Sequence, residues 1–257
     1  MKKMNLMSAC KKAHVELAEE FLAAGANVHE TTRKGKTALM YAARGGHPKL
    51  VSLLLEHGAD VHAQTLSGKT PLLYACSAGQ EGAATLLLEH GASVQVHTAE
   101  GRTPLMEAAR SGATGLVEAL LNRGAEPEAR DALGATALML AARKGRWGTV
   151  QLLLKRGAQV QAQDVLGRTA FLHAASKGRR DVASLLLRHG AQLNEADKEG
   201  YTALLLAALR GKRRMVEFLL SCGANPDARN HAGAGLAELA RLSGHPQWAE
   251  MLRQGKL

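Results

Sequence analysis

Positively charged side chains at recurring positions are the residues of this chain with the clearest potential for chemistry. The stretch RKGKTALMYAARGG, residues 33–46, places Arg33, Lys34, Lys36 and Arg44 around a glycine and a short alanine-rich run. Ammonium and guanidinium groups bind carboxylates and phosphates. The same skeleton of fixed letters returns further along the chain, which indicates a surface for acidic ligands built by repetition.

The overall charge agrees with this interpretation. The 257-residue chain has a net charge of +10 and an isoelectric point near 9.8. A basic balance favours acidic partners, which include acidic proteins, nucleic acid and anionic lipid surfaces, and does not choose among them. The hydrophobic content of 46% is normal for a folded protein, whereas aromatic residues make up only 3%.

Residue patterns for catalysis or metal binding do not occur in the sequence. It contains no glycine-rich nucleotide loop, no H-E-x-x-H, no G-x-S-x-G and no C-x-x-C. Histidines such as His57, His90 and His189 occupy one equivalent position in different repeats, where stacking would hold them about 10 Å apart or more. Because that spacing is too wide for a shared metal ion, we expect no enzyme activity, no metal and no cofactor.

The cysteines and the apolar runs bear on the compartment. Cys10, Cys76 and Cys222 are an odd number without close spacing, which argues against a disulfide framework and suits a reducing environment. Lysines interrupt the apolar residues near the N-terminus, and no run reaches the roughly 18 apolar residues that a membrane span needs. We therefore expect a cytoplasmic or nuclear protein that does not associate with membranes.

Three series of glycines set the secondary structure that must position the charges. Gly35 begins a series that returns every 33 residues through Gly233, and two further series follow it in fixed phase. A threonine two residues after the first glycine predicts the N-cap of one helix. The second glycine predicts the left-handed end of that helix, and the third ends a second helix with a leucine-rich face.

These units resemble ankyrin repeats. The segment DALGATALMLAARKGRWGTVQLLLKRGAQVQA, residues 131–162, follows the family pattern almost throughout, and the resemblance extends over essentially the whole chain. It implies an all-α solenoid of stacked helix-turn-helix units with β-hairpin-like finger loops. The expected organisation is one repeat domain over 1–257, with terminal capping units at 1–31 and 230–257 and full repeats at 32–64, 65–97, 98–130, 131–163, 164–196 and 197–229.

The resemblance also implies a binding surface on the finger loops and the end of each first helix. Of the 36 variable positions there in the six full repeats, fifteen are basic and two are acidic. Tyr201 adds an aromatic side chain at a finger position, and Trp147 lies among basic residues at an interhelical loop, where it would either anchor a partner or pack against the next loop. The candidate partner-binding residues are Arg33, Lys34, Lys36, Arg44, Lys69, Arg102, Arg110, Arg143, Lys144, Trp147, Arg168, Lys177, Tyr201 and Arg210.

Several readings of that surface remain open. The leading one is a monomeric scaffold or adaptor that binds an acidic segment of a partner protein along a basic concave groove. The alternatives are a merely solvated charged face and RNA binding through the same residues, although single-strand binders usually stack bases on aromatic rings. In the sequence LLLRHGAQLN, Asn194 also resembles the hairpin asparagine that some family members offer to an asparaginyl hydroxylase, and asparagine suits a turn in any case.

Overall fold

The computed structural model describes residues 5–248, and the chain divides into two compact units, Met1–Ala132 (unit 1) and Leu133–Leu257 (unit 2). The helices of unit 1 are α1 (Leu6–Lys11), α2 (Val15–Ala23), α3 (Ala38–Gly45), α4 (Pro48–Glu56), α5 (Pro71–Ala78), α6 (Glu81–Glu89), α7 (Pro104–Ser111) and α8 (Thr114–Asn122). Those of unit 2 are α9 (Ala137–Lys144), α10 (Trp147–Lys155), α11 (Ala170–Ser176), α12 (Arg180–Arg188), α13 (Ala203–Leu209), α14 (Arg213–Ser221) and α15 (Leu236–Leu242).

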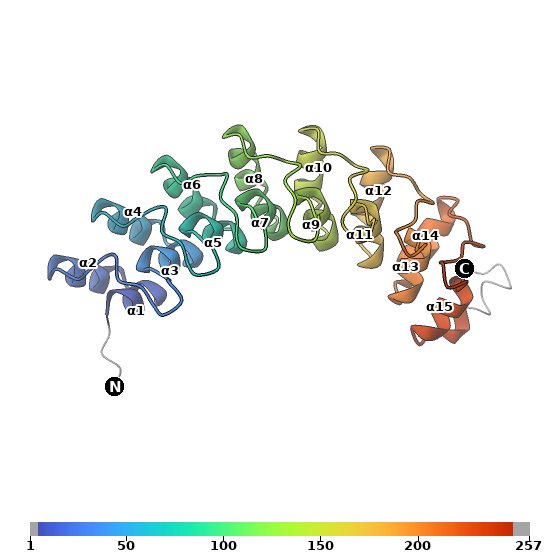
Figure 1. Cartoon of the computed structure of the whole chain (residues 1–257), viewed down its shortest axis with the longest axis horizontal. Helices are drawn as coiled ribbons and strands as arrows, with labels where there is room; N and C mark the ends of the chain where they lie inside the picture. The colour runs from blue at the N-terminus through green and yellow to red at the C-terminus, as the bar shows by residue number, and fades with distance from the viewer. Residues whose placement is uncertain (1–4, 249–257) are drawn as a thin grey trace. The chain divides into compact units, whose positions relative to one another are not determined.

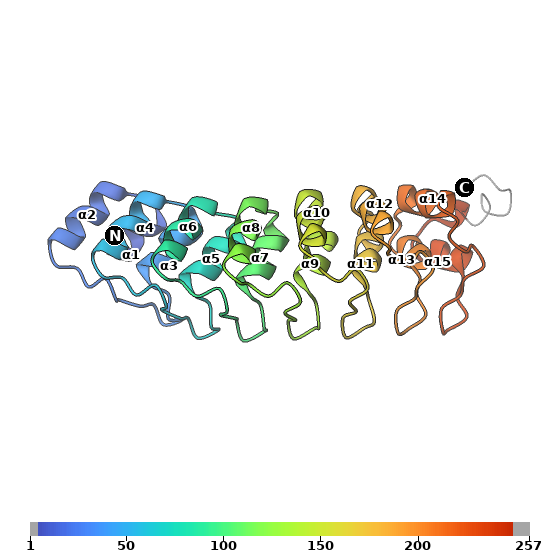
Figure 2. The same cartoon turned by 90° about the horizontal axis from the view of Figure 1, so that it is seen from above.

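Within each unit the helices form two layers (Figure 1). In unit 1 the odd-numbered helices pack side by side in the order α1, α3, α5 and α7, and the even-numbered helices pack in the order α2, α4, α6 and α8. Unit 2 repeats this arrangement with α9, α11, α13 and α15 in one layer and α10, α12 and α14 in the other. Figure 2 shows the loops before the odd helices extending away from the helices in each unit.

Helices α3, α5, α7 and α9 begin and end at the predicted residues, whereas α11 and α13 begin at the predicted threonine but end one residue before the predicted glycine, at Lys177 and Arg210. The Thr37 hydroxyl accepts a hydrogen bond from the Met40 N–H at 3.3 Å, and Thr169 accepts one from Leu172 at 3.4 Å. These bonds satisfy an N–H group that has no partner inside the helix. Helix α3 ends at Gly46, whose backbone is left-handed with φ of 69°. The capping pattern is therefore local, which is why the sequence predicts it.

A tight turn precedes each odd helix from α3 onward, and the turns of neighbouring repeats within a unit stack on one another. We call residues 32–36 and their equivalents in later repeats the finger turns. The Leu66 N–H donates to the Lys34 carbonyl at 3.2 Å, and Val165 donates in the same way to Leu133 at 3.0 Å. Gly35 has φ of 74°, and a side chain there would stand 3.1 Å from the Thr65 backbone. Glycine is required there by its backbone conformation and by the close approach of the next turn.

Leucine and alanine fill the core. Leu39, Leu72, Leu105 and Leu138 come from odd helices of successive repeats and are each 1% exposed, while paired alanines allow the helices to approach closely. Between residues 5 and 248 the only extended pairing is a pair of isolated bridges, at Ala196–Thr202 and Arg229–Gly235. The predicted all-α stack of helix pairs is thus confirmed. Every helix in this range is too short or too polar to cross a membrane.

Candidate interaction surface

The candidate residues lie in the finger turns and at the ends of odd helices, and they divide between the two units. Trp147 is the exception, because it is the first residue of the even helix α10. Unit 1 contains Arg33, Lys34, Lys36, Arg44, Lys69, Arg102 and Arg110, and unit 2 contains Arg143, Lys144, Trp147, Arg168, Lys177, Tyr201 and Arg210. A single groove that joins the two sets stays a prediction.

In unit 1 the finger lysines lie over tyrosine rings. The Lys36 ammonium is 5.6 Å from the centre of the Tyr41 ring and 5.4 Å from that of Tyr74, and the Lys69 ammonium is 5.9 Å from the Tyr74 ring. Burial raises the pKa of Tyr74, while the positive charges of Lys69 and Arg44 act in the opposite direction. The rings therefore hold the lysines by cation–π attraction. Each tyrosine follows a finger lysine by five positions in the sequence.

Two predicted cations of unit 1 are already paired with carboxylates. Arg110 donates to Glu107 through Nε at 2.9 Å and approaches the same oxygen through a second nitrogen at 2.8 Å. Arg102 Nε lies 2.9 Å from the buried carboxylate of Asp131, and its Nη1 lies 3.9 Å from Glu107. The count of charges at the 36 variable positions did not include Glu107 and Asp131, because both lie outside those positions. Because both pairs are partly sheltered from solvent, these arginines offer less free charge than the count implies.

A similar pairing neutralises the finger arginine of unit 2. Arg168 Nε donates to Asp197 at 2.9 Å, and the Asp197 side chain is 1% exposed. In the same unit His173 Nε2 lies 2.8 Å from Asp164. The pKa of Asp164 is lowered: burial alone would raise it, but the bonds from His173 and from the Arg168 and Leu166 N–H groups outweigh that effect. Asp164 and Asp197 thus fix two turns. They also pair with His173 and Arg168, which are then less available to an acidic partner.

The cations at the ends of the odd helices in unit 2 remain together. Arg143, Lys177 and Arg210 line one pocket of about 180 Å³, together with His173 and Leu206. The pKa of Lys177 is lowered, first by partial burial and then by the positive charges of Arg143, Arg210, Lys212 and Lys144. An anion bound in this pocket would relieve the mutual repulsion of these cations, because they have no ion pair among the described residues.

The aromatic candidates occupy different surroundings. Trp147 is 42% exposed and lines a separate pocket of about 370 Å³ with Arg179, Arg180 and Arg214. Tyr201 is half-buried, and its backbone N–H donates to Asp197 at 3.0 Å. Trp147 therefore has the exposure and basic surroundings of an interface anchor, whereas Tyr201 belongs to a finger turn held by its own aspartate.

Asn194 lies exposed in a turn of unit 2. Its side-chain oxygen accepts a hydrogen bond from the Asn225 N–H of the next repeat at 3.0 Å. The asparagine thus has a structural role in joining neighbouring repeats, and its modification stays a prediction.

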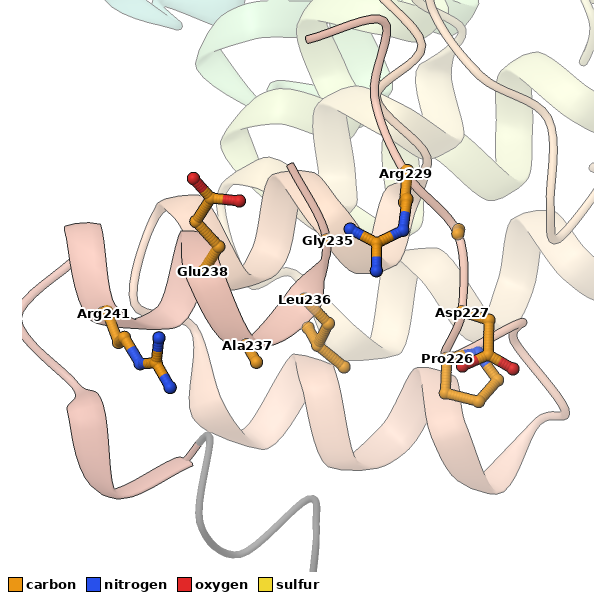
Figure 3. A pocket seen from close by; sticks show the side chains of 9 residues that line it. Pro226, Asp227, Arg229, Gly235, Leu236, Ala237, Glu238 and Arg241 are labelled. Carbon is orange, nitrogen blue, oxygen red and sulfur yellow. The ribbon is translucent and has the colours of Figure 1, made fainter. Parts of the chain in front are cut away.

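A further pocket of about 290 Å³ lies in the last described repeat (Figure 3). Figure 3 shows Asp227 and Arg229 in the chain before helix α15, and Glu238 and Arg241 on that helix. Acidic and basic side chains are mixed there, in contrast to the pocket at Arg143, Lys177 and Arg210. This makes it a poorer match for a ligand of one charge sign.

The described residues give little support to reactive chemistry. Burial raises the pKa of the Cys10 thiol to about 11 and that of the wholly buried Cys76 further, so both stay protonated at neutral pH. Between residues 5 and 248, three or more His, Cys, Asp or Glu side chains nowhere gather in a way that could hold a metal ion.

Comparison with known proteins places this geometry in a family. A family model described as ankyrin repeats (3 copies) matches residues 6–98, 91–164 and 138–230. Among solved structures, the crystal structure of the human ASB11 ankyrin repeat domain is similar, with a TM-score of 0.74 and 26% sequence identity. The match covers 83% of this chain and 98% of that domain. A search of curated proteins finds no match.

Proposed function

The chain belongs to the ankyrin-repeat family, whose members are generally protein-interaction modules, and from this premise we propose that it is a non-enzymatic scaffold or adaptor. Its partner would be a protein with an acidic segment, bound by the basic finger turns and by the ends of the odd helices. Charge would steer the encounter and select the partner, and exposed apolar and aromatic side chains would anchor it. We further propose that it acts as a monomer in the cytoplasm or nucleus, where buried free thiols stay reduced.

The observation that carries this proposal is the set of exposed cations on the odd-helix ends of unit 2. Arg143, Lys144, Lys177 and Arg210 are exposed, and the described residues of the chain provide none of these side chains with an ion pair. Solubility alone is served by mixed charges, whereas this cluster has one sign. An acidic partner would complement it.

Charge reversal tests the proposal. Arg143→Glu, Lys144→Glu and Lys177→Glu together should weaken binding of a fluorescent glutamate-rich peptide more than tenfold, because like charges at an interface cost several kcal/mol. The matched control reverses Lys49, Lys155 and Arg188, which are exposed on even helices. The measurement is fluorescence anisotropy at low and high salt, with circular dichroism to check folding. Equal binding by both triple variants and the parent would refute the proposal.

The same assay addresses RNA binding. A single-stranded RNA oligonucleotide should bind more weakly than the peptide, because base-stacking aromatic side chains are scarce on this surface. Tight RNA binding with a steep dependence on salt would favour the nucleic-acid function instead.

A further inference from the structure

The pocket at the odd-helix ends of unit 2 combines two features that a general acidic surface does not need. Its lining brings together three cations from three successive repeats, Arg143, Lys177 and Arg210. It also includes apolar side chains from two finger turns, Leu133, Val165 and Leu166, which we call the apolar shelf. The two features lie on opposite parts of the repeat, the helix ends and the turns, and the fold brings them to one cavity.

The three cations are not engaged elsewhere in the described part of the chain. The fourth cation of the pocket, Arg168, is held by Asp197. The one carboxylate in the lining, Asp164, is taken by His173 and by two backbone N–H groups. No hydrogen bond or ion pair of residues 5–248 involves the side chains of Arg143, Lys177 or Arg210, and the lowered pKa of Lys177 reflects burial and their mutual repulsion.

Helix ends explain only part of this cluster. A cation near the C-terminus of a helix is stabilised by the helix dipole. In unit 1, however, the position of Lys177 and Arg210 is occupied by Gly45, Ala78 and Ser111, which carry no charge. The position of Arg143, one residue earlier, is occupied there by Arg44, Ser77 and Arg110, and Arg110 is paired with Glu107. A requirement of the helices themselves would apply to both units alike. The convergence of unpaired cations in unit 2 therefore indicates a ligand.

The apolar shelf is unusually open to solvent. Leu133 is 61% exposed, Val165 is 50% exposed and Leu166 is 46% exposed, and the buried side chain of Leu206 continues the apolar surface into the pocket. Covering such side chains stabilises a complex by about 25 cal/mol for each Å² removed from water. A ligand that carries an anionic group next to an apolar group would satisfy both parts of the lining.

We propose that this pocket binds a phosphorylated serine or threonine of the partner's acidic segment, with an apolar residue beside it on the apolar shelf. The inference rests on the proposed function and specifies its ligand. A phosphate group carries a charge of about −1.5 to −2 and three acceptor oxygens, so it can engage several cations at once, whereas a carboxylate carries a single charge. Tryptophan, tyrosine and phenylalanine are absent from the lining, which disfavours RNA bases as the occupant.

The test compares short fluorescent peptides that differ at one position. They carry phosphothreonine, threonine or glutamate in one glutamate-rich sequence, followed by leucine or alanine, and are titrated with the full-length protein. The phosphothreonine–leucine peptide should bind about tenfold or more tightly than its glutamate counterpart. Arg143→Gln, Lys177→Gln and Arg210→Gln should each remove most of that preference. The matched control is Lys155→Gln, which removes an exposed cation from the even helix α10 of the same unit and should leave the ratio unchanged.

The apolar half of the inference has its own variant. Leu166→Ser should abolish the difference between the leucine and alanine peptides and should leave the preference for phosphate intact. Equal affinity for the phosphothreonine and glutamate peptides would overturn the inference while the proposed function survives. Failure of the parent protein to bind any of the acidic peptides would overturn both the inference and the proposed function. Displacement of the phosphopeptide by an unrelated RNA oligonucleotide at equal concentration would assign the pocket to nucleic acid instead.

Discussion

Units 1 and 2 build the same finger turn from different side chains. In unit 1 the hydroxyls of Thr32, Thr65 and Thr98 each accept the N–H group four residues later, at 3.0, 3.0 and 3.2 Å. In unit 2 one carboxylate oxygen of Asp164 and of Asp197 accepts two such N–H groups at 2.9 to 3.0 Å. The second carboxylate oxygen is then available to hold His173 or Arg168.

This difference changes where free positive charge lies. The hydroxyl turns of unit 1 neutralise no cation, and Lys36 and Lys69 lie over tyrosine rings with their charge intact. The carboxylate turn at Asp197 neutralises Arg168, and the unpaired cations that line the pocket of unit 2 come from the odd-helix ends. Exchanging threonine for aspartate at the start of the turn therefore removes a free cation from a neighbouring finger turn.

The largest expected effect comes from removing the carboxylate turn. Asp197→Ala should lower the free energy of unfolding by about 2–3 kcal/mol, because it leaves Arg168 and two N–H groups without their charged acceptor. Asp197→Thr copies the turn of unit 1 and should cost about 1 kcal/mol less than the alanine change, since the hydroxyl can still accept an N–H group. Urea unfolding measures both. Equal losses would show that the two turns are not interchangeable.

The next largest effect is expected at low pH, which should destabilise a carboxylate turn of unit 2 before a hydroxyl turn of unit 1. Asp164 has a lowered pKa in the folded chain, so its contribution to stability is present above the unfolded value near 3.9 and is lost as the pH falls through the folded value. Hydroxyl turns do not titrate. Below about pH 4, hydrogen exchange should therefore rise at residues 164–168 before it rises at residues 65–69. The variant Asp164→Thr should remove this difference, and simultaneous loss of protection in both turns would contradict the interpretation.

The sequence predicted local features well and pairings between repeats poorly. Thr37 and Gly46 act within one helix, so the 33-residue period is enough to assign them. Pairing of Arg102 with Asp131 depends on how one finger turn stacks on the next, and the pattern of a single repeat does not reveal it. The glycine period also continues unbroken through residue 132, so no local signal marks the division into two compact units.

The smallest expected effect is the attraction between Lys36 and Tyr74, which has no counterpart among the described residues of unit 2, because leucine, histidine and leucine occupy the equivalent positions 140, 173 and 206. A cation–π pair at a partly exposed site contributes about 0.5–1 kcal/mol. In a double-mutant cycle, Lys36→Met and Tyr74→Leu should each destabilise the chain, and the double variant should lose less than the sum by that amount. A second cycle pairs Lys36→Met with Tyr41→Leu, because the Lys36 ammonium is 5.6 Å from the Tyr41 ring as well. Strict additivity in both cycles would mean that the rings only pack, and that the finger lysines of unit 1 are held no more firmly than any solvated charge.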